Sequence, residues 1–360
     1  MKIVHIINSL ESGGAEKLVL DTLPLFEKNN VTVDLIVVNG FEYPFLKVLR
    51  SLNCCTVHSL NLKSAYNPIA IFKLVPLLKK YNIAHVHLFP TQYWVVLAKF
   101  LSGSKIKLVY TEHSTSGRRI KSGWFQKLDP FFYKQYDKII AISDEVAQVV
   151  KKHTKLESSV ELIPNGVAIT QFKDSESANR LTLFPSCSDD IRIIIQVASF
   201  KEPKDQKTVI RSLLYLPENV QLILIGEGVL QEECIILTQK LHLDHRVLFL
   251  GVRVDIPQLT KMADIAVVSS EYEGFSLAAV EAMASGKPVI ATDVPALNTI
   301  VNGAGLLFKL GDEKQLASHI EKLLSNDVYY QEVAFRGLQR AKKYDIKLMV
   351  DKQIKMYDSL

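Results

Sequence analysis

The 360-residue sequence is poor in cysteine and tryptophan, with four and two residues respectively. Two of the cysteines, Cys54 and Cys55, are neighbours, so the set provides neither a disulfide framework nor the spacing of a structural zinc site. No run approaches the roughly eighteen apolar residues that a membrane-spanning helix needs. Met1–Ile7 is interpreted as a first strand rather than a signal peptide, because polar Asn8 and Ser9 follow at once. These absences favour a cytoplasmic globular protein.

The net charge is also small, at +5, and no nucleic-acid-binding motif accompanies it, so nucleic acid is not expected as a partner. The charge is nevertheless uneven, since the segment from Lys99 to Lys134 is strongly basic and contains Trp124 and Phe125. Such a segment predicts contact with anionic lipid headgroups, although a solvated basic surface or contacts with an anionic acceptor are alternatives. Its basic residues are Lys99, Lys105, Lys107, Arg118, Arg119, Lys121, Lys127 and Lys134.

Strand-like apolar runs alternate with helical patterns along the chain, which predicts an α/β fold with parallel sheets built from βαβ units. The length of 360 residues allows two domains. A polar segment from Ala168 to Asp190 interrupts the alternation, and a second alternation starts at Ile191. The expected strands are Lys2–Ile7, Thr32–Val38, Ala84–Leu88, Lys107–Thr111, Lys138–Ala141 and Val160–Ile163, then Ile191–Val197, Gln221–Ile225, Val247–Leu250, Ile265–Val268 and Pro288–Ala291.

The most specific motif is a pair of glutamates eight residues apart, Glu273 and Glu281. Ile265–Val268 is predicted to be a buried strand, and Ser276 is predicted to be the N-cap of the following helix. Glu273 would then lie at the carboxyl end of a parallel strand, where open α/β sheets bind ligands. Glu281, just over one turn into the helix, would point at the same crevice. Two carboxylates there suit a polyol; the plainer alternative is two surface glutamates around a glycine turn.

This run resembles the E-x7-E signature of the retaining glycosyltransferases of family 4. The resemblance spans nearly the whole chain and implies the GT-B architecture, two doubly wound Rossmann-like domains that face each other across a cleft. It implies an acceptor domain over residues 1–168, a linker over 169–190 and a donor domain over 191–344. The helix expected near 345–360 would pack back onto the first domain.

Two glycines, Gly13 and Gly14, follow the first strand and open a helix. They let the backbone approach a ligand closely, and the free N–H groups of the helix start favour an anion, although a plain turn explains them equally well. The resemblance implies that Gly14 touches the donor diphosphate. It also implies that Gly13 and Gly14 contact the acceptor together with Arg118 and Arg119.

Three histidines in the first half of the chain are candidate binding residues. His113 lies just beyond a predicted strand, where the resemblance implies a histidine that contacts the donor sugar. His85 and His87 alternate along another strand and share a face, a spacing seen in metal sites. No third ligand is evident in the sequence, so packing within the strand is the preferred interpretation. We therefore predict no metal site, and the fold class is expected to work without a metal ion.

The loop after Val197 departs from the family pattern. Lys204 matches the lysine that the family places on the donor phosphates, but Ser199 stands where an arginine is common. Because neutralising the leaving diphosphate is central to sugar transfer, another group must fill the gap. The candidates are Lys201, Arg118, Arg253 or the helix N-terminus.

The resemblance thus implies a retaining glycosyltransferase that moves a sugar from a nucleoside diphosphate, with UDP favoured, to a hydroxyl of a glycan or lipid-linked acceptor. It points to bacterial surface polysaccharide synthesis, in the cytoplasm with peripheral contact at the inner face of the cell membrane. The alternatives are a nucleotide-sugar epimerase or sugar phosphorylase on the same fold, or a non-catalytic sugar-nucleotide binding module. The implied catalytic residues are His113, Lys204 and Glu273, and the implied donor contacts are Gly14, Lys204, Gly226, Glu227, Arg253, Glu273, Gly274, Phe275, Ser276 and Glu281.

Overall fold

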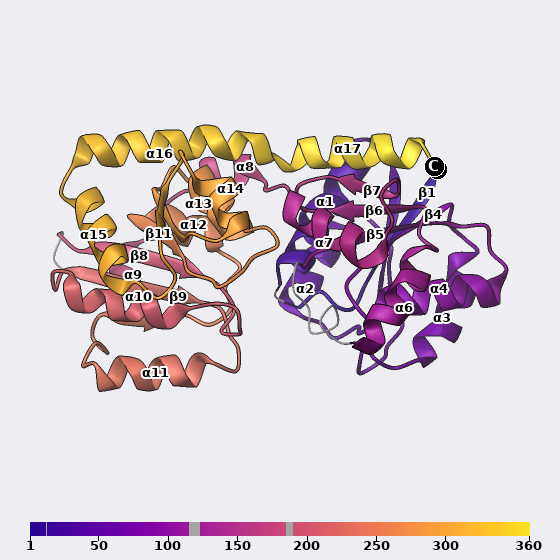
Figure 1. Cartoon of the computed structure of the whole chain (residues 1–360), viewed down its shortest axis with the longest axis horizontal. Helices are drawn as coiled ribbons and strands as arrows, with labels where there is room; N and C mark the ends of the chain where they lie inside the picture. Colours follow the sequence, from indigo (N-terminus) through magenta and orange to yellow (C-terminus); the bar gives the residue numbers. More distant parts are fainter. Residues whose placement is uncertain (12, 115–122, 185–189) are drawn as a thin grey trace. The chain divides into compact units, whose positions relative to one another are not determined.

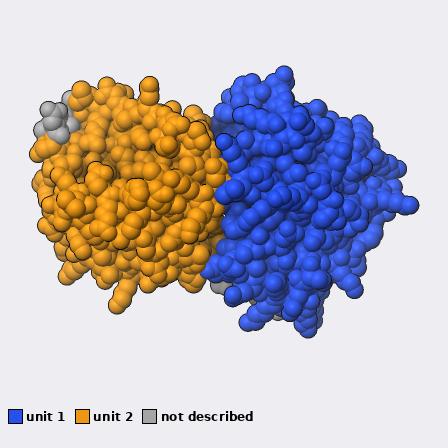
Figure 2. Space-filling model, turned by 90° about the horizontal axis from the view of Figure 1, so that it is seen from above, with its two compact units in different colours: residues 1–166, 346–360 blue, residues 167–345 orange. Residues whose placement is uncertain are grey.

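A computed structural model describes the backbone of residues 1–11, 13–114, 123–184 and 190–360, and the side chains of these residues except 123–126. The chain divides into two compact units, which Figure 2 shows in different colours. Unit 1 comprises residues 1–166 and 346–360, and unit 2 comprises residues 167–345. Among the described residues, no helix is both long and apolar enough to cross a membrane.

Unit 1 is built on a parallel sheet whose described strands lie in the order β3-β2-β1-β4-β5-β6-β7 (Figure 1). The central strands are buried along almost their whole length, because helices cover both faces of a parallel sheet. This burial explains why their sequences are continuous apolar runs. The strands are β1 (Lys2–Ile7), β2 (Thr32–Val37), β3 (Val57–Ser59), β4 (Ile83–His87), β5 (Lys107–Glu112), β6 (Lys138–Ala141) and β7 (Val160–Leu162).

The helices of unit 1 follow local sequence signals, and α7 (Asp144–Thr154) shows this well. The Ser143 side chain accepts the backbone N–H of Val146, which caps the helix start, and Asp144 and Glu145 lie in the first turn, where negative charge is favourable. The other helices are α1 (Gly14–Lys28), α2 (Pro44–Leu52), α3 (Ile69–Leu78), α4 (Thr91–Ser102), α6 (Gly123–Tyr133) and α17 (Ile346–Asp358).

The C-terminal helix α17 belongs to unit 1, although it is far from the rest of that unit in sequence. It buries Met349 and Tyr357, and the Tyr357 ring lies 6.0 Å from the ring of Phe26 in α1. The backbone N–H of Gly166 donates to Met349 Sδ at 3.2 Å. A side chain at position 166 would collide with the backbone of Ile346, so the glycine permits this close approach.

Unit 2 is built on a second parallel sheet, with its described strands in the order β10-β9-β8-β11-β12-β13. Along β8, Ile193 and Ile195 pack into one hydrophobic cluster, and Ile194 packs into another. Alternate side chains of a strand point to opposite faces, so this sheet has an apolar core on each side. The strands are β8 (Arg192–Val197), β9 (Val220–Ile225), β10 (Val247–Phe249), β11 (Ile265–Val268), β12 (Val289–Thr292) and β13 (Leu306–Phe308).

The helices of unit 2 mostly connect successive strands of its sheet, although the first two precede β8 and the last two follow β13. They are α8 (Ile169–Lys173), α9 (Arg180–Leu183), α10 (Gln206–Ser212), α11 (Gln231–Lys240), α12 (Ile256–Met262), α13 (Leu277–Ala284), α14 (Pro295–Val301), α15 (Glu313–Leu324) and α16 (Asp327–Ala341), with short 3-10 turns at η1 (Leu213–Tyr215) and η2 (Lys342–Tyr344).

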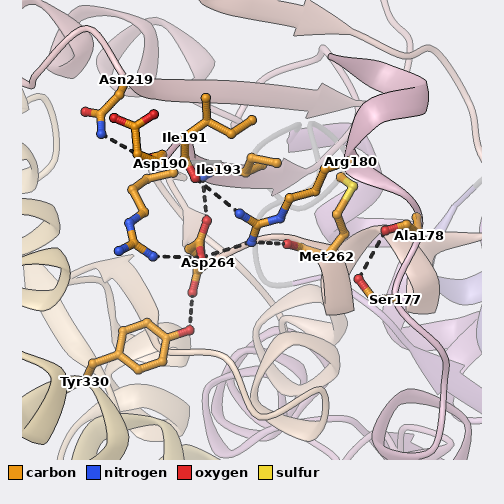
Figure 3. Close-up of polar contacts among 11 residues, drawn as sticks. Ser177, Ala178, Arg180, Asp190, Ile191, Ile193, Asn219, Met262, Asp264 and Tyr330 are labelled. Atoms are coloured by element: carbon orange, nitrogen blue, oxygen red, sulfur yellow. Dashed lines mark hydrogen bonds and ion pairs between the residues drawn. The ribbon is translucent and has the colours of Figure 1, made fainter. Parts of the chain in front are cut away.

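The segment 169–190, expected as a linker, is folded into unit 2 wherever the structure describes it. Ile169 and Phe172 of α8 are part of the hydrophobic core. Arg180 of α9 donates to the backbone carbonyl of Met262 at 2.8 Å and pairs with Asp264 at 3.1 Å (Figure 3). The Asp264 carboxylate also accepts the backbone N–H of Ile193 at 2.7 Å. Polar groups of the segment thus attach it to the amino-terminal ends of the central strands β8 and β11.

Both sheets reverse their strand order at one point, between β1 and β4 in unit 1 and between β8 and β11 in unit 2. In open α/β sheets, ligands bind outside the carboxyl ends of the strands at such a switch point. The loops that follow these four strands are therefore where a site is expected.

Candidate functional site

The loops after β8 and β11 run side by side at the switch point of unit 2. Lys204 and Ser270 form an antiparallel bridge, and the backbone N–H of Asp205 donates to the carbonyl oxygen of Ser269 at 3.0 Å. Ser269 and Ser270 are fully buried. The two loops therefore form one hydrogen-bonded surface at the carboxyl ends of their strands.

Lys204 and Glu273 contact each other on this surface. The Lys204 ammonium forms an ion pair and hydrogen bond with Glu273 Oε1, and the Ser270 hydroxyl donates to the same oxygen at 3.0 Å. Both side chains are largely buried, with 22 % of Lys204 and 11 % of Glu273 exposed. The family resemblance implied a donor contact for each residue but no contact between them. An anionic ligand here would share or replace the carboxylate as the partner of Lys204.

Asp205 holds the start of α10 beside this pair. One carboxylate oxygen accepts the backbone N–H of Thr208 at 3.1 Å, and the other accepts the Ser269 hydroxyl at 2.9 Å. The next residue, Gln206, donates from its side chain to the carbonyl oxygen of Ser199 at 3.1 Å. Sequence reasoning missed Asp205, although an aspartate before a helical pattern is an N-cap signal. These bonds fix the backbone on both sides of Lys204.

The predicted N-cap at Ser276 is confirmed, because its hydroxyl accepts the backbone N–H of Ala279 at 3.3 Å at the start of α13. Glu281 lies on the same helix and is 9 % exposed. Gly274 and Phe275 are half-buried in the preceding loop, and the Phe275 ring lies 5.3 Å from the ring of Tyr344. The strand, loop and capped helix expected around the two glutamates are therefore present.

Glycines let the neighbouring loops of unit 2 approach one another. Gly226 has a φ of +133°, and a side chain there would collide with the carbonyl of Ala198. Its N–H donates to the carbonyl oxygen of Gly251 at 2.9 Å. The backbone carbonyl of Glu227, a residue that is exposed, accepts the N–H of Phe200 at 3.0 Å. The loops after β8, β9 and β10 thus meet at the same edge of the sheet.

The residues that could replace the arginine missing at position 199 differ in the contacts that they already make. The Arg253 guanidinium binds both carboxylate oxygens of Asp255, at 2.8 and 2.6 Å, and these bonds lower the pKa of Asp255. To reach a phosphate, Arg253 would have to leave that pairing. Lys201 is exposed on the loop that carries Lys204. The third candidate, Arg118, lies outside the described residues.

The expected anion site of unit 1 is at the start of α1. The helix begins at Gly14, and its N-cap Gly13 makes no side-chain cap bond. The Glu16 carboxylate occupies the space that a side chain at Gly13 would need. A negative group in the first turn is favourable there, so an anionic ligand at Gly14 would compete with Glu16.

His113 lies beyond β5 and is half-buried, with its Nε2 atom 3.2 Å from His87 Nδ1. Burial lowers the pKa of His113 to about 4, so the imidazole is neutral at neutral pH. In β4, His85 and His87 do share a face, and β1 places His5 beside them. No third ligand was evident from the sequence, but the sheet brings His5 to this pair, and ring nitrogens of all three imidazoles lie within 4.8 Å of one another. The expected absence of a metal site stays a prediction.

Part of the predicted acceptor and membrane surface lies outside the described residues. This applies to Arg118, Arg119 and Lys121, and to the side chains of Trp124 and Phe125. Their assignments stay predictions. The described parts of the same segment include Lys105, Lys127 and Lys134, all of which are exposed.

Comparisons with known proteins cover nearly the whole chain. A family described as Glycosyltransferase Family 4 matches residues 12–171, and one described as Glycosyl transferases group 1 matches residues 186–343. The N-acetyl-alpha-D-glucosaminyl L-malate synthase of Bacillus anthracis is 29 % identical over 268 residues, which cover 71 % of this chain and 68 % of that protein.

Two further comparisons extend over full-length chains. The N-acetylgalactosamine-N,N'-diacetylbacillosaminyl-diphospho-undecaprenol 4-alpha-N-acetylgalactosaminyltransferase of Campylobacter jejuni is 26 % identical over 364 aligned residues, covering 96 % of each chain. The crystal structure of HepE from Anabaena in complex with UDP-glucose has a TM-score of 0.88, 22 % identity and 100 % coverage of both chains. The comparison with HepE establishes that this chain and HepE share a fold.

Proposed function

Because the chain is a glycosyltransferase of the family 4 type with the GT-B fold, we propose that it is a retaining enzyme with a UDP-sugar donor. The acceptor is a hydroxyl of a glycan or lipid-linked sugar, as in bacterial surface polysaccharide synthesis. Two comparisons support this choice. The Campylobacter relative is named for a diphospho-undecaprenol acceptor, and HepE was crystallised with UDP-glucose.

The observation that carries the proposal is the Lys204–Glu273 pair at the switch point of unit 2. Breaking the bond between sugar and diphosphate places negative charge on the leaving phosphate, and a fixed cation stabilises this charge more in the transition state than in the ground state. Lys204 is held by its bridge to Ser270 and by the capped helix that follows. It supplies the positive charge, so the scheme requires no metal ion.

The remaining donor contacts are assigned around this pair. Glu273 and the backbone of Gly274, Phe275 and Ser276 hold the donor sugar and phosphate. Glu281, buried on α13, accepts hydrogen bonds from the ribose hydroxyls. The loops that contain Gly226, Glu227 and Arg253 surround the nucleoside, and the start of α1 at Gly14 approaches the diphosphate. In a retaining transfer of this kind, the leaving phosphate oxygen takes the acceptor proton on the same face of the sugar.

We assign the acceptor to unit 1, with Gly13, Arg118 and Arg119 as contacts, and His113 as the residue that orients the donor sugar. A neutral imidazole suits this role because it can donate or accept a hydrogen bond without adding charge. The half-buried position of His113 and its contact with His87 support the assignment.

A peripheral contact with the inner face of the cell membrane is also part of the proposal. Phe100 and Phe131 are each 54 % exposed and their rings lie 6.4 Å apart on α4 and α6, while neighbouring Leu101 is 61 % exposed. Exposed Lys127 and Lys134 flank this apolar surface in the sequence. Aromatic and basic residues together are typical of surfaces that bind anionic lipid.

The test is a donor panel assayed with a lipid-diphosphate-linked sugar as the acceptor, with the products examined by NMR. Transfer from a UDP-sugar with the anomeric configuration of the donor preserved is the expected result. An inverted product would contradict the retaining mechanism. An epimerised nucleotide sugar formed without acceptor, or turnover that needs inorganic phosphate, would instead identify one of the alternative enzymes. Binding of a nucleotide sugar with no turnover of any kind would identify the protein as a non-catalytic binding module.

A further inference from the structure

The histidines at the switch point of unit 1 form part of one continuous string of hydrogen-bonded side chains. At one end, the Thr111 hydroxyl lies 2.6 Å from His85 Nε2, and His85 Nδ1 lies 2.5 Å from the hydroxyl of Tyr357. Tyr357 is on the C-terminal helix α17, so residues from three separate parts of the sequence meet here. The string connects β5, β4 and α17 in its first two links.

The string continues from Tyr357 to the end of β5. The Tyr357 hydroxyl lies 3.4 Å from His5 Nε2, and His5 Nδ1 lies 3.1 Å from His87 Nε2. The last link joins His87 Nδ1 to His113 Nε2 at 3.2 Å. The full order is Thr111, His85, Tyr357, His5, His87 and His113.

The string is neutral along its length. All of its members except His113 are buried. Burial lowers the pKa of His5 to about 3 and that of His113 to about 4, and it lowers the pKa values of His85 and His87 well below the usual value. Each imidazole therefore carries one N–H and one lone pair, and each hydroxyl carries one proton.

Neutral groups in this string can share their protons in three ways, because each link needs one donor and one acceptor and the Tyr357 hydroxyl oxygen can accept two hydrogen bonds. Either every group donates towards His113, or every group donates towards Thr111, or His85 and His5 both donate to the Tyr357 hydroxyl, whose own proton then has no acceptor among the described residues. In the second arrangement the Thr111 hydroxyl accepts from His85, and its own proton needs another acceptor. Within the described residues, His85 is the sole side-chain partner of that hydroxyl. The first arrangement gives every proton of the fully buried groups an acceptor and leaves only the N–H of half-buried His113 unused, so it is favoured, since a buried donor without an acceptor is destabilising.

We propose that this string fixes His113 as the neutral tautomer with its proton on Nδ1, and that Tyr357 is a positioning residue for His113. The inference rests on the proposed function only where it makes His113 a donor-sugar contact. With Nε2 accepting from His87, the N–H left for a ligand is at Nδ1. His113 should therefore recognise a hydrogen-bond acceptor, such as a sugar hydroxyl oxygen or a phosphate oxygen.

The same three buried imidazoles could be considered as a metal site, since their ligand atoms lie within 4.8 Å of one another. Every ring nitrogen of His5, His85 and His87 is already engaged in the string. In the described part of the chain, no carboxylate or thiolate joins the three to balance a divalent charge, and burying an unbalanced charge is strongly unfavourable. The hydrogen-bonded string is therefore the better account of the cluster.

The test is the tautomer of His113, measured by NMR on full-length protein labelled with ¹⁵N-histidine and assigned by the signal lost in His113→Gln. The wild type should show a neutral ring protonated at Nδ1 at neutral pH. Tyr357→Phe keeps the ring and removes the hydroxyl that joins the two halves of the string, so the His113 signals should move towards a mixture of tautomers. Tyr136→Phe is the matched control, because it removes another buried tyrosine hydroxyl of unit 1, one that donates to the Gln92 carbonyl.

Thr111→Val is an independent second variant, because it removes the donor at the head of the string. It should also shift the His113 tautomer, and it keeps the inference testable if Tyr357→Phe does not fold. The rate of sugar transfer should be roughly tenfold lower in Tyr357→Phe, which corresponds to the loss of about one hydrogen bond. In Tyr136→Phe this rate should not change.

The inference is wrong if wild-type His113 is protonated at Nε2, or if neither Tyr357→Phe nor Thr111→Val changes its signals. Stoichiometric metal in the purified protein, measured by elemental analysis, would also overturn it. The tautomer is read without substrate, so a protein that binds no nucleotide sugar but shows these shifts would contradict the proposed function and leave the string intact.

Discussion

The two units share one topology but place polar groups differently at their switch points. In unit 1 the central strands themselves carry His5, His85 and His87, deep inside the sheet. In unit 2 the corresponding strands β8 and β11 are lined by residues such as Ile194 and Ile265, and the charged groups lie in the loops beyond. Polar groups inside a sheet must be neutral and fully hydrogen-bonded, whereas groups at the loop edge can form an ion pair.

This difference predicts that acid destabilises unit 1 selectively, which is the largest effect that we expect. The folded pKa values of its buried histidines lie below the unfolded value of about 6.5. Below pH 6.5 the unfolded state therefore binds more protons, and stability falls as pH falls. Each imidazole contributes about 1.4 kcal/mol per pH unit, a loss that continues to about pH 4 for His113 and about pH 3 for His5.

Native-state hydrogen exchange between pH 7 and pH 5 measures this loss unit by unit. The free energy of opening of β1 and β4 should fall by several kcal/mol, on the scale of the sum over these histidines. Amides of β8 and β11 should change much less, since neither of these strands contains a histidine. Equal losses in both sheets would show that the buried imidazoles are not the cause.

The loop pair of unit 2 predicts a large effect on catalysis. Lys204→Ala should lower kcat roughly a hundredfold, because one fixed donor to the leaving group is lost, and should change donor affinity less. Lys207→Ala is the matched control, because Lys207 is in the next helix and pairs with Glu233 instead. Steady-state kinetics over a range of donor concentrations up to saturation separates kcat from the donor affinity. A Lys204→Ala enzyme with full kcat would mean that another residue, such as Lys201, holds the phosphate.

Glu281→Ala should weaken donor binding rather than turnover. A buried carboxylate that accepts hydrogen bonds from ribose hydroxyls contributes about 1.5–3 kcal/mol, or roughly ten- to a hundredfold in affinity. Calorimetric titration with UDP measures the loss directly. Exposed Glu321 on α15 provides the control, as Glu321→Ala. Unchanged affinity in a folded Glu281→Ala protein would remove the ribose assignment.

The smallest effect per residue is expected at the surface of unit 1 that contains exposed lysines and the exposed rings of Phe100 and Phe131. Changing Lys105, Lys127 and Lys134 to Gln should weaken binding to anionic liposomes by about 1 kcal/mol for each charge. The loss should be smaller in high salt, where exposed charges are screened. Liposome co-sedimentation measures it, with neutral liposomes for comparison.

A matched control for this surface comes from unit 2, where Lys240, Lys314 and Lys322 are also exposed. Changing these three to Gln removes the same charge and should leave liposome binding intact. If both triple variants lose binding equally, the attraction depends on net charge alone and not on the surface of unit 1.

Local sequence signals predicted the α/β fold, the strand before Glu273 and the cap at Ser276, because hydrophobic runs and caps act over a few residues. The edge strands β3 and β13 were missed, although β7 and β10, which are also three residues long, were predicted. Only one residue of β3, Val57, is apolar, so this strand has no hydrophobic run. The segment 169–190 did not show its place in unit 2 because its apolar residues that pack in or against the core, such as Ile169, Phe172 and Leu183, are few and lie apart in a polar sequence.

The contacts within the candidate site could not be predicted from local patterns. His5 joins His85 only because β1 lies next to β4 in the sheet, and that order depends on the whole topology. The pairing of Lys204 with Glu273 likewise joins residues 69 positions apart. Strand order and register determine such contacts, and the spacing of neighbouring residues predicts neither of them.

The central claim is that the donor nucleotide binds at the switch point of unit 2. Hydrogen exchange with and without UDP tests it most directly, because a ligand protects the amides that it orders or covers. Protection should concentrate in the loops at residues 198–205 and 269–276 and at the start of α13, and at the same UDP concentration it should be much weaker in Glu281→Ala. Protection that leaves these loops unchanged and appears elsewhere in the chain would contradict the account.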